Sequence, residues 1–219
     1  MDANNNGYDT LRREYAEIAE RYETRWKFYV EASIRETLSR ICVSAEDRVL
    51  DVGCGTGMLL KALSLRMPQA HLAGVDLSFG MLKVARLKLG ANVRLEQAYA
   101  ETLPFADDTF DLTVSTNVMH FVRKPVEALR EMKRVLKPSG IVLVTDWCDD
   151  YFICRVCDIF LRLFSRGHFR TYGSEDCRRL LLDADFANVD VERYKINWLW
   201  GLMTATGKKS PATYKRNKR

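Results

Sequence analysis

The chain has 219 residues, of which 47% are hydrophobic and 29% charged, a balance that suits one soluble domain burying roughly 70% of its unfolded surface. No apolar run reaches about 18 residues, and the polar start, Met1 to Gly7, lacks the apolar core of a signal peptide. These features exclude a membrane span and predict a cytoplasmic protein.

The net charge of +5 is concentrated at one end of the sequence. Residues 208–219 hold six basic residues and no acid, so subtracting them leaves −1 for residues 1–207. Such a run is more typical of a solvated end than of an arm that binds nucleic acid. We therefore expect one domain over residues 1–207 and a basic, disordered tail over 208–219, with no nucleic-acid partner. The oligomeric state is left open.

The six cysteines do not indicate a disulfide framework, because a chain of this size has an ample core. Cys154 and Cys157 have a metal-like spacing, but no second pair exists and only His168 lies near them in the sequence. A zinc site needs about four ligands. We expect buried thiols and no metal.

Residues 8–40 are the first expected helical region. Apolar residues recur there at steps of three and four, from Leu11 to Leu38, on a face that is unusually aromatic. One interpretation is a helix that only packs against the domain. The other is a lid whose Tyr15 and Tyr22 help to close a ligand pocket. The sequence leaves both open.

The segment Val49 to Gly57 (VLDVGCGTG) reads as a buried strand that runs into a glycine-rich turn, with a helix following from Met58. Glycines at alternate positions let a ligand approach the main chain without a Cβ in the way. Asp51, at the strand end, would repel a pyrophosphate and attract an ammonium group, and the spacing is G-x-G-x-G rather than the dinucleotide pattern G-x-G-x-x-G. An adenosyl ligand with an amino-acid tail fits best, with a merely tight turn as the alternative.

A second carboxylate, Asp76, ends the next expected strand, Ala70 to Asp76, and lies 19 residues after Gly57. In α/β nucleotide folds an acid at this place binds both ribose hydroxyls. The alternative role is the N-cap of the following helix, which Ser78 can fill instead. The spacing from the glycine turn favours the ribose site.

The rest of the chain continues the alternation of strands and helices. We expect helices at 79–89, 125–137 and 174–184, strands at 92–97, 110–115 and 141–146, and a terminal hairpin at 189–206 that turns at Asn197. This order predicts a parallel sheet covered on both faces, with the ligand at the carboxyl ends of its strands.

Residues 147–173 break this alternation and concentrate seven aromatic residues in 27 positions. We expect this segment to lie over the open end of the sheet and, with the N-terminal helix, to form the acceptor pocket. Its candidate acceptor residues are His168, Phe169 and Tyr172. Core packing is the alternative for Ile153 to Phe164, whose apolar residues have helical spacing.

Four motifs in order resemble the class I S-adenosylmethionine-dependent methyltransferases, most closely the branch of the ubiquinone and menaquinone C-methyltransferases. They are the glycine segment, Gly74 to Ser78 (GVDLS), Ala100 to Phe105 (AETLPF) with Phe110-Asp111, and Arg134 to Gly140 (RVLKPSG). The resemblance implies an α/β, three-layer, Rossmann-like sheet of seven strands, mostly parallel, with an antiparallel hairpin at 187–207.

The resemblance also implies S-adenosylmethionine as the cofactor and a set of residues around it. The methionine tail would lie along Gly53 and Gly55, with Cys54 and Gly57 in the same turn, and its amino group would face Asp51. Asp76 would bind the ribose, and Leu77 would pack on the adenine. Ala100 and Glu101 would border the adenine edge, and Asn117 would lie beside the methionine. The chain departs from the family at Tyr99, where an acid often contacts the adenine.

Methyl transfer needs alignment more than acid–base chemistry, and a base only where the nucleophile carries a proton of high pKa. His120, near the expected pocket, is the candidate base, with a structural histidine as the alternative. No Asn/Asp-Pro-Pro turn, Pro-Cys nucleophile or metal-ligand acid follows the fourth strand, so a small-molecule acceptor remains. A protein or RNA methyltransferase that docks through the tail, and a non-catalytic cofactor-binding protein, are the alternatives.

Overall fold

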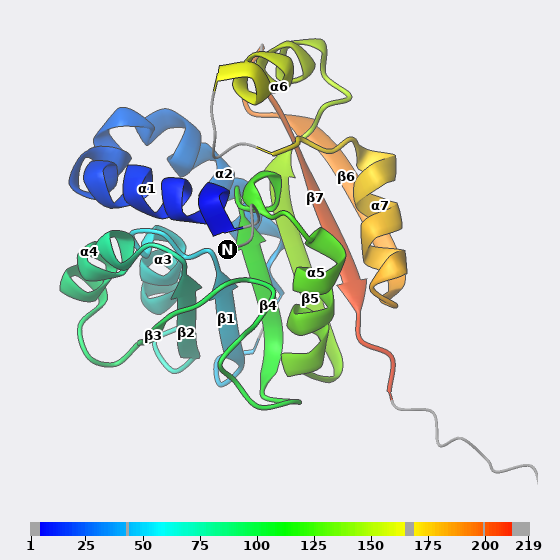
Figure 1. Ribbon diagram of the computed structural model, residues 1–219. Helices are drawn as coiled ribbons and strands as arrows, with labels where there is room; N and C mark the ends of the chain where they lie inside the picture. Colours follow the sequence, from blue (N-terminus) through cyan, green and yellow to red (C-terminus); the bar gives the residue numbers. More distant parts are fainter. Residues whose placement is uncertain (1–4, 43, 165–168, 199, 212–219) are drawn as a thin grey trace, which may run out of the picture.

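The computed structural model describes residues 5–42, 44–164, 169–198 and 200–211. Its centre is a seven-stranded sheet in the order β3-β2-β1-β4-β5-β7-β6 (Figure 1). The strands are β1 (Arg48–Val52), β2 (His71–Asp76), β3 (Arg94–Gln97), β4 (Phe110–Thr116), β5 (Leu136–Trp147), β6 (Ala187–Lys195) and β7 (Gly201–Lys208). Strands β1 to β5 pair in parallel, and β7 is antiparallel to both β5 and β6. The predicted sheet and its terminal hairpin are confirmed.

The core has two halves, one on each face of the sheet, because successive side chains of a strand point to opposite faces. In β1, Leu50 and Val52 lie in one cluster and Val49 lies in the other. The first cluster contains buried residues of α5 (Pro125–Val135) and α7 (Ser174–Asp183), and the second contains those of α3 (Met58–Arg66) and α4 (Phe79–Leu89). The predicted three-layer α/β architecture is therefore present.

The N-terminal helical region consists of two helices, α1 (Asn5–Arg25) and α2 (Lys27–Arg40), which meet at Trp26. Trp26 leaves helical geometry, with φ −114° and ψ 19°. Helix α1 packs on the start of α4, where a Cβ on Gly80 would lie 2.7 Å from the Cα of Ala16. Because Gly80 has no side chain, α1 comes close to the carboxyl ends of the strands (Figure 1).

The boundary between α5 and β5 differs from the sequence-based prediction. Helix α5 ends at Val135 rather than near Lys137, and β5 begins at Leu136 rather than Ile141. The reason is an irregularity in the sheet: Leu136 pairs with Phe110, and the register then shifts before Ile141 pairs with Leu112. Strand β5 includes Leu136 and Lys137, which the local sequence assigns to the helix, because β4 pairs with the start of β5.

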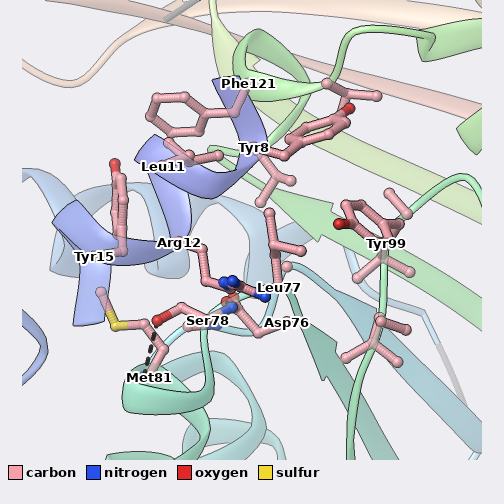
Figure 2. A pocket seen from close by; sticks show the side chains of 18 of the residues that line it. Tyr8, Leu11, Arg12, Tyr15, Asp76, Leu77, Ser78, Met81, Tyr99 and Phe121 are labelled. Carbon is pink, nitrogen blue, oxygen red and sulfur yellow. Dashed lines mark hydrogen bonds between the residues drawn. The ribbon is translucent and has the colours of Figure 1, made fainter. Parts of the chain in front are cut away.

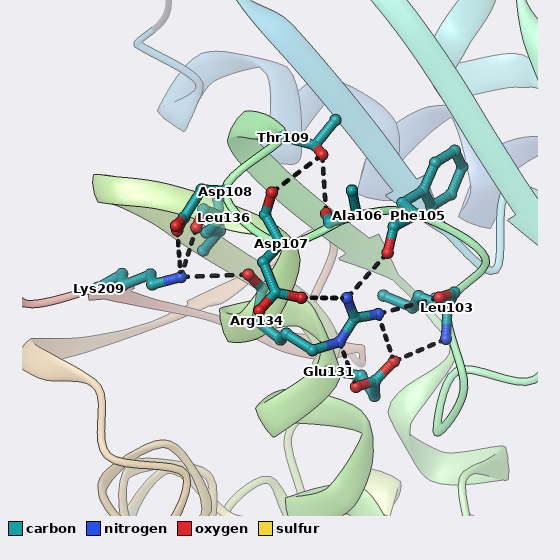
Figure 3. A network of polar contacts seen from close by, with 10 residues as sticks. All are labelled: Leu103, Phe105, Ala106, Asp107, Asp108, Thr109, Glu131, Arg134, Leu136 and Lys209. Carbon is teal, nitrogen blue, oxygen red and sulfur yellow. Dashed lines mark hydrogen bonds and ion pairs between the residues drawn. The ribbon is translucent and has the colours of Figure 1, made fainter. Parts of the chain in front are cut away.

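The first two basic residues of the expected tail, Lys208 and Lys209, belong to the fold. Lys208 ends β7, and the Lys209 ammonium donates to the Asp108 carboxylate at 2.7 Å and to the Leu136 carbonyl at 2.7 Å (Figure 3). Residues 212–219 of the expected tail lie outside the described residues. Two of the six basic residues assigned to the tail are thus part of the fold.

The segment after β5 contains α6 (Phe152–Phe164), which lies beyond the carboxyl end of the sheet (Figure 1). A short 3-10 helix, η1 (Met119–Phe121), follows β4. Within the described parts of the chain, none of the helices combines the length and the apolar character that crossing a bilayer requires.

Candidate functional site

The glycine turn connects β1 to α3, and its three glycines have φ values of +79°, +53° and +76°. The N–H groups of Gly53 and Cys54 both donate to the Val75 carbonyl, at 2.8 and 2.9 Å, which ties the turn to β2. The turn therefore has one fixed shape, in a backbone region that disfavours residues with a Cβ.

The three glycines have different surroundings, although Gly53 and Gly55 both line a pocket. A Cβ on Gly53 would lie 2.3 Å from Val118, and a Cβ on Gly57 would lie 2.8 Å from Leu89, so these two positions need close packing. A Cβ on Gly55 would meet nothing within 4 Å, and Gly55 lines a pocket. Gly55 therefore leaves room for a ligand, whereas Gly57 serves the packing of α3 on α4.

Asp76 lies at the end of β2, and its carboxylate holds two turns. Its oxygens accept hydrogen bonds from the N–H groups of Gly55 and Ser78, both at 2.8 Å. Burial raises the pKa of Asp76 to about 6, against the lowering effect of these two bonds. Ser78 caps α4 by accepting from the Met81 N–H at 3.4 Å, so Asp76 is not needed as the cap. The carboxylate oxygens retain lone pairs for a ribose.

Asp51, on β1, is 2% exposed and does not line the pocket. Burial raises its pKa to about 8, and the negative charge of Asp76 adds to the effect. A buried carboxyl group of this kind favours a nearby cation, which would stabilise its ionised form. Cys54 is also buried, with its Sγ packed toward Gly74, so only its backbone faces the turn.

The pocket in front of the glycine turn, called here the first pocket, is lined from both the sheet and α1. Leu77, Ala100, Glu101 and Asn117 line it, in agreement with the sequence-based expectation that they lie together. Figure 2 shows side chains of α1 on the opposite wall, facing Asp76 and Leu77; those that line the pocket are Tyr8, Leu11, Arg12, Tyr15 and Tyr22.

Tyr8 fastens α1 to the loop beyond β3. Its hydroxyl donates to the Glu101 carboxylate and accepts from the Arg123 N–H at 2.9 Å. Its ring lies 5.3 Å from that of Tyr99. The sequence-based site missed Tyr8, Leu11 and Arg12, although helical spacing puts Tyr8 on the same face as Tyr15.

Arg134 of α5 holds the stretch from Leu103 to Asp107, which follows Ala100 and Glu101 in the chain (Figure 3). The Arg134 guanidinium donates to the Leu103 and Phe105 carbonyls at 3.0 and 2.8 Å, and to the Glu131 and Asp107 carboxylates. Glu131 also accepts from the Leu103 N–H at 2.9 Å. A charged group that bonds several carbonyls of one loop fixes the shape of that loop.

A second pocket, of about 330 Å³, adjoins the first. The two share the residues Leu11, Tyr15, Tyr22, Asn117 and Phe121. The further lining of the second pocket combines the rings of Trp26, Tyr29, His120 and Trp147 with Ile18 and the charged residues Glu14 and Arg25. Its volume lies within the range of small-molecule sites.

Asn117 lies at the boundary between the two pockets, at the end of β4. Its backbone has φ +60°, and its N–H donates to the Thr145 carbonyl at 2.8 Å. Its side-chain oxygen accepts from the Tyr29 hydroxyl, and its amide donates to the Ser33 hydroxyl at 2.8 Å. The Trp147 indole N–H donates to the same Tyr29 hydroxyl. Helix α2 therefore fixes the orientation of Asn117.

His120 lines the second pocket from η1 and is itself buried. Its Nδ1 lies 2.6 Å from an oxygen of Asp146, whose other oxygen accepts the His120 backbone N–H at 3.2 Å. The imidazole also stacks on Trp147, with 5.2 Å between ring centres. A carboxylate on Nδ1 fixes the orientation of the ring.

The three other candidate acceptor residues lie in different places. Phe169 packs against Tyr8, at 6.1 Å between rings, and under the Arg123 guanidinium at 4.4 Å. Tyr172 is buried in the core cluster between α5 and α7 and lines neither pocket. His168 lies outside the described residues. Among the residues of the segment 147–173 that the structure describes, Trp147 is the one that lines the second pocket.

Comparison with known proteins identifies the family to which the chain belongs. Residues 50–144 match the model of the methyltransferase domain. The chain is 34% identical to the malonyl-[acyl-carrier protein] O-methyltransferase of Legionella pneumophila over 65% of its own length, but it spans only 51% of that relative. It is 32% identical to the demethylmenaquinone methyltransferase of Staphylococcus aureus, over 67% of this chain and 70% of that protein.

Among solved structures, an S-adenosylmethionine-dependent methyltransferase of Thermotoga maritima superposes with a TM-score of 0.74, at 23% identity, over 91% of this chain and all of that one. This likeness shows a shared fold. Because the fold, the glycine turn with Asp76 and the sequence relatives agree, the chain belongs to the class I S-adenosylmethionine-dependent methyltransferases.

Proposed function

We propose that the protein transfers a methyl group from S-adenosylmethionine to a small, apolar or aromatic acceptor that binds in the second pocket. The observation that carries this proposal is the aromatic pocket that shares Asn117, Tyr15 and Phe121 with the cofactor pocket. A shared wall brings a bound acceptor within reach of the methyl group.

The first pocket fits the cofactor in its chemistry. Gly55 leaves the space that a Cβ would fill, and Asp76 presents a carboxylate there. When bound, the cofactor supplies a sulfonium methyl group to the nucleophile. The protein's part is to align the acceptor and to exclude water. Tyr15 and Tyr22 of α1 line both pockets and would serve both purposes. The proposed lid role of α1 rests on these two residues.

Lys209, one of the basic residues assigned to the tail, gives little support to docking of a polyanion. Lys209 is only partly exposed, and its ammonium group is bonded to Asp108 and to two carbonyls. The aromatic second pocket instead suits a small acceptor. The names of the sequence relatives suggest two acceptor classes to test, a demethylated quinol and a malonyl thioester.

The acceptor is tested by methyl transfer from labelled S-adenosylmethionine to a demethylated naphthoquinol and to a malonyl thioester. We expect turnover of the quinol, and Trp147→Ala should lower it at least about tenfold because it removes the aromatic wall. The affinity for S-adenosylhomocysteine should not change, because Trp147 does not line the first pocket. Unimpaired turnover in Trp147→Ala would place the acceptor elsewhere, and no turnover with normal cofactor binding would favour a non-catalytic protein.

His120 is proposed as the general base for an acceptor that must lose a proton. We expect His120→Gln to lower kcat by about 10²-fold or more, the usual range for loss of a general base. Turnover of labelled S-adenosylmethionine measures this loss. An unchanged kcat in His120→Gln would leave the histidine a structural role.

Cofactor affinity is expected to depend on pH through Asp51. Its pKa of about 8 means that the unliganded site holds a proton at pH 7, which a cationic amino group must displace. The dissociation constant should therefore fall by up to about tenfold per unit as pH rises from 6.5 to 8. Calorimetry of S-adenosylhomocysteine binding measures this slope.

The unliganded protein should show the opposite trend in stability. Folding raises the pKa of Asp51, so the folded protein keeps a proton on Asp51 that the unfolded chain releases above pH about 4. The free energy of unfolding should therefore fall as pH rises from about 4 to about 8. Asp51→Asn should flatten both the affinity slope and this stability slope. A dissociation constant with the same slope in Asp51→Asn would contradict the placement of the amino group.

A further inference from the structure

Helix α6 exposes a continuous apolar face. Phe152 is 80% exposed and Ile159 is 54% exposed, and Val156 and Phe160 are exposed beside them. The spacing of four, three and one residues puts all four side chains on one side of the helix. The opposite side faces the domain: the Cys154 thiol donates to the Gly201 carbonyl at 3.4 Å, and the buried Asp158 accepts from the Thr171 N–H at 2.7 Å.

The turn between β6 and β7 adds an exposed tryptophan at the same end of the molecule. Trp198 is 83% exposed. The Lys195 ammonium group donates to the Trp198 carbonyl at 3.4 Å and lies 5.7 Å from the ring centre of Tyr151, the residue before α6. We call Phe152, Val156, Ile159, Phe160 and Trp198 the α6 surface.

The sequence around the α6 surface is rich in arginine. From Phe152 to Arg170 it contains four arginines and one acid, Asp158. Asp158 is buried, so the described part of α6 exposes Arg155 and no acid. Arg155, Arg193 and Arg170 form ion pairs with Asp149, Asp150 and Asp176, and each of these arginines is more exposed than its carboxylate partner. An apolar helix face with exposed arginines at its border is complementary to an anionic lipid surface.

The shape of the α6 surface also favours a lipid over a folded partner. Its side chains project from a helix and from a turn, and none of them lines either pocket. Exposed aromatic residues that protrude in this way suit the interface between headgroups and acyl chains. Figure 1 shows α6 at the end of the sheet where α1 lies, and β5 ends there with Trp147 of the second pocket.

We propose that the α6 surface docks the protein on an anionic membrane surface, with its apolar side chains in the headgroup region. Docking would place the carboxyl end of the sheet, and with it the second pocket, toward the lipid. The inference does not require the proposed methyl acceptor, because it rests on the exposed side chains and their charge.

The experiment is co-sedimentation of the full-length protein with vesicles of phosphatidylcholine alone and of phosphatidylcholine with phosphatidylglycerol. We expect binding to the anionic vesicles, weaker binding to the neutral ones, and weakening by salt. Ile159→Glu should reduce the partition coefficient at least about tenfold, because it puts a charge in the buried face, and Phe152→Ala should reduce it less.

Leu87→Glu is the matched control, because Leu87 is 84% exposed on α4, away from α6. It should bind vesicles as the wild type does. Ile159→Glu and Leu87→Glu should keep the wild-type melting curve and the wild-type affinity for S-adenosylhomocysteine. A changed melting curve would reveal a folding defect, and a lack of S-adenosylhomocysteine binding would reveal a failed methyltransferase assignment. The proposal is overturned if the wild type does not bind anionic vesicles, or if Ile159→Glu matches Leu87→Glu. It is also overturned if light scattering shows a dimer that Ile159→Glu dissociates, because the face is then a contact between two copies.

Discussion

Asp76→Ala is expected to weaken S-adenosylhomocysteine binding by roughly 2–4 kcal/mol, or about 30- to 1000-fold, because it removes the two charge-assisted hydrogen bonds that we propose Asp76 makes to the ribose. The change also removes the acceptor of the hydrogen bonds that the Gly55 and Ser78 N–H groups donate to Asp76. The stability loss should be small, because folding already disfavours the ionised carboxylate, as its pKa of about 6 shows. Calorimetry gives the dissociation constant, and thermal melting without ligand gives the stability.

Asp111→Ala is the matched control for this experiment. Asp111 lies near the amino end of β4, far from the pockets, and accepts from the Arg48 N–H at 2.9 Å and from the Lys137 ammonium at 2.7 Å. Its loss should lower the melting temperature without changing the affinity for S-adenosylhomocysteine. An Asp76→Ala protein that binds as tightly as the wild type would show that the carboxylate only holds the turns.

Gly53→Ala is expected mainly to lower stability, whereas Gly55→Ala is expected mainly to lower cofactor affinity. Gly53→Ala forces an alanine into a left-handed backbone, with its Cβ 2.3 Å from Val118, and should lose about 2–4 kcal/mol of unfolding free energy. Gly55→Ala meets no neighbour, so its stability loss should be about 1 kcal/mol, from the backbone alone. Its Cβ projects into the first pocket, and cofactor affinity should fall by at least about tenfold.

Urea unfolding and calorimetry on the same two variants separate these effects. Gly53→Ala combined with Val118→Ala should recover part of the lost stability, because it removes the methyl groups that the new Cβ meets. If Gly55→Ala binds S-adenosylhomocysteine as the wild type does, the ligand does not lie against this turn. Equal stability losses in the two single variants would show that backbone strain, rather than the clash, determines both.

Much of the candidate cofactor site was predictable from short stretches of sequence. The strand, the glycine turn and Asp51 are contiguous, and Asp76 follows at a spacing set by one strand–helix–strand unit. Each depends on local geometry, since the ends of parallel strands must meet at one edge of the sheet. The sequence could also show that Ser78 is available as a helix cap, which the structure confirms.

The individual roles of the glycines were not predictable in the same way. The sequence treats Gly53, Gly55 and Gly57 alike, because all three permit a positive φ. Only packing distinguishes them: Gly53 lies against Val118 and Gly57 lies against Leu89, whereas Gly55 faces open space. These neighbours come from other elements of the fold.

The second pocket and the closure of the first were decided by tertiary structure. Tyr8 reaches Glu101 across 93 positions, Tyr29 reaches Asn117 across 88, and His120 meets Asp146 across 26. Helical periodicity places Tyr8 and Tyr15 on one face but does not say what that face covers. Local sequence thus determined the strand–turn–helix unit that presents the cofactor site. The docking of α1 and α2 on the sheet determined which side chains complete it, because such contacts depend on the packing of elements that are distant in the chain.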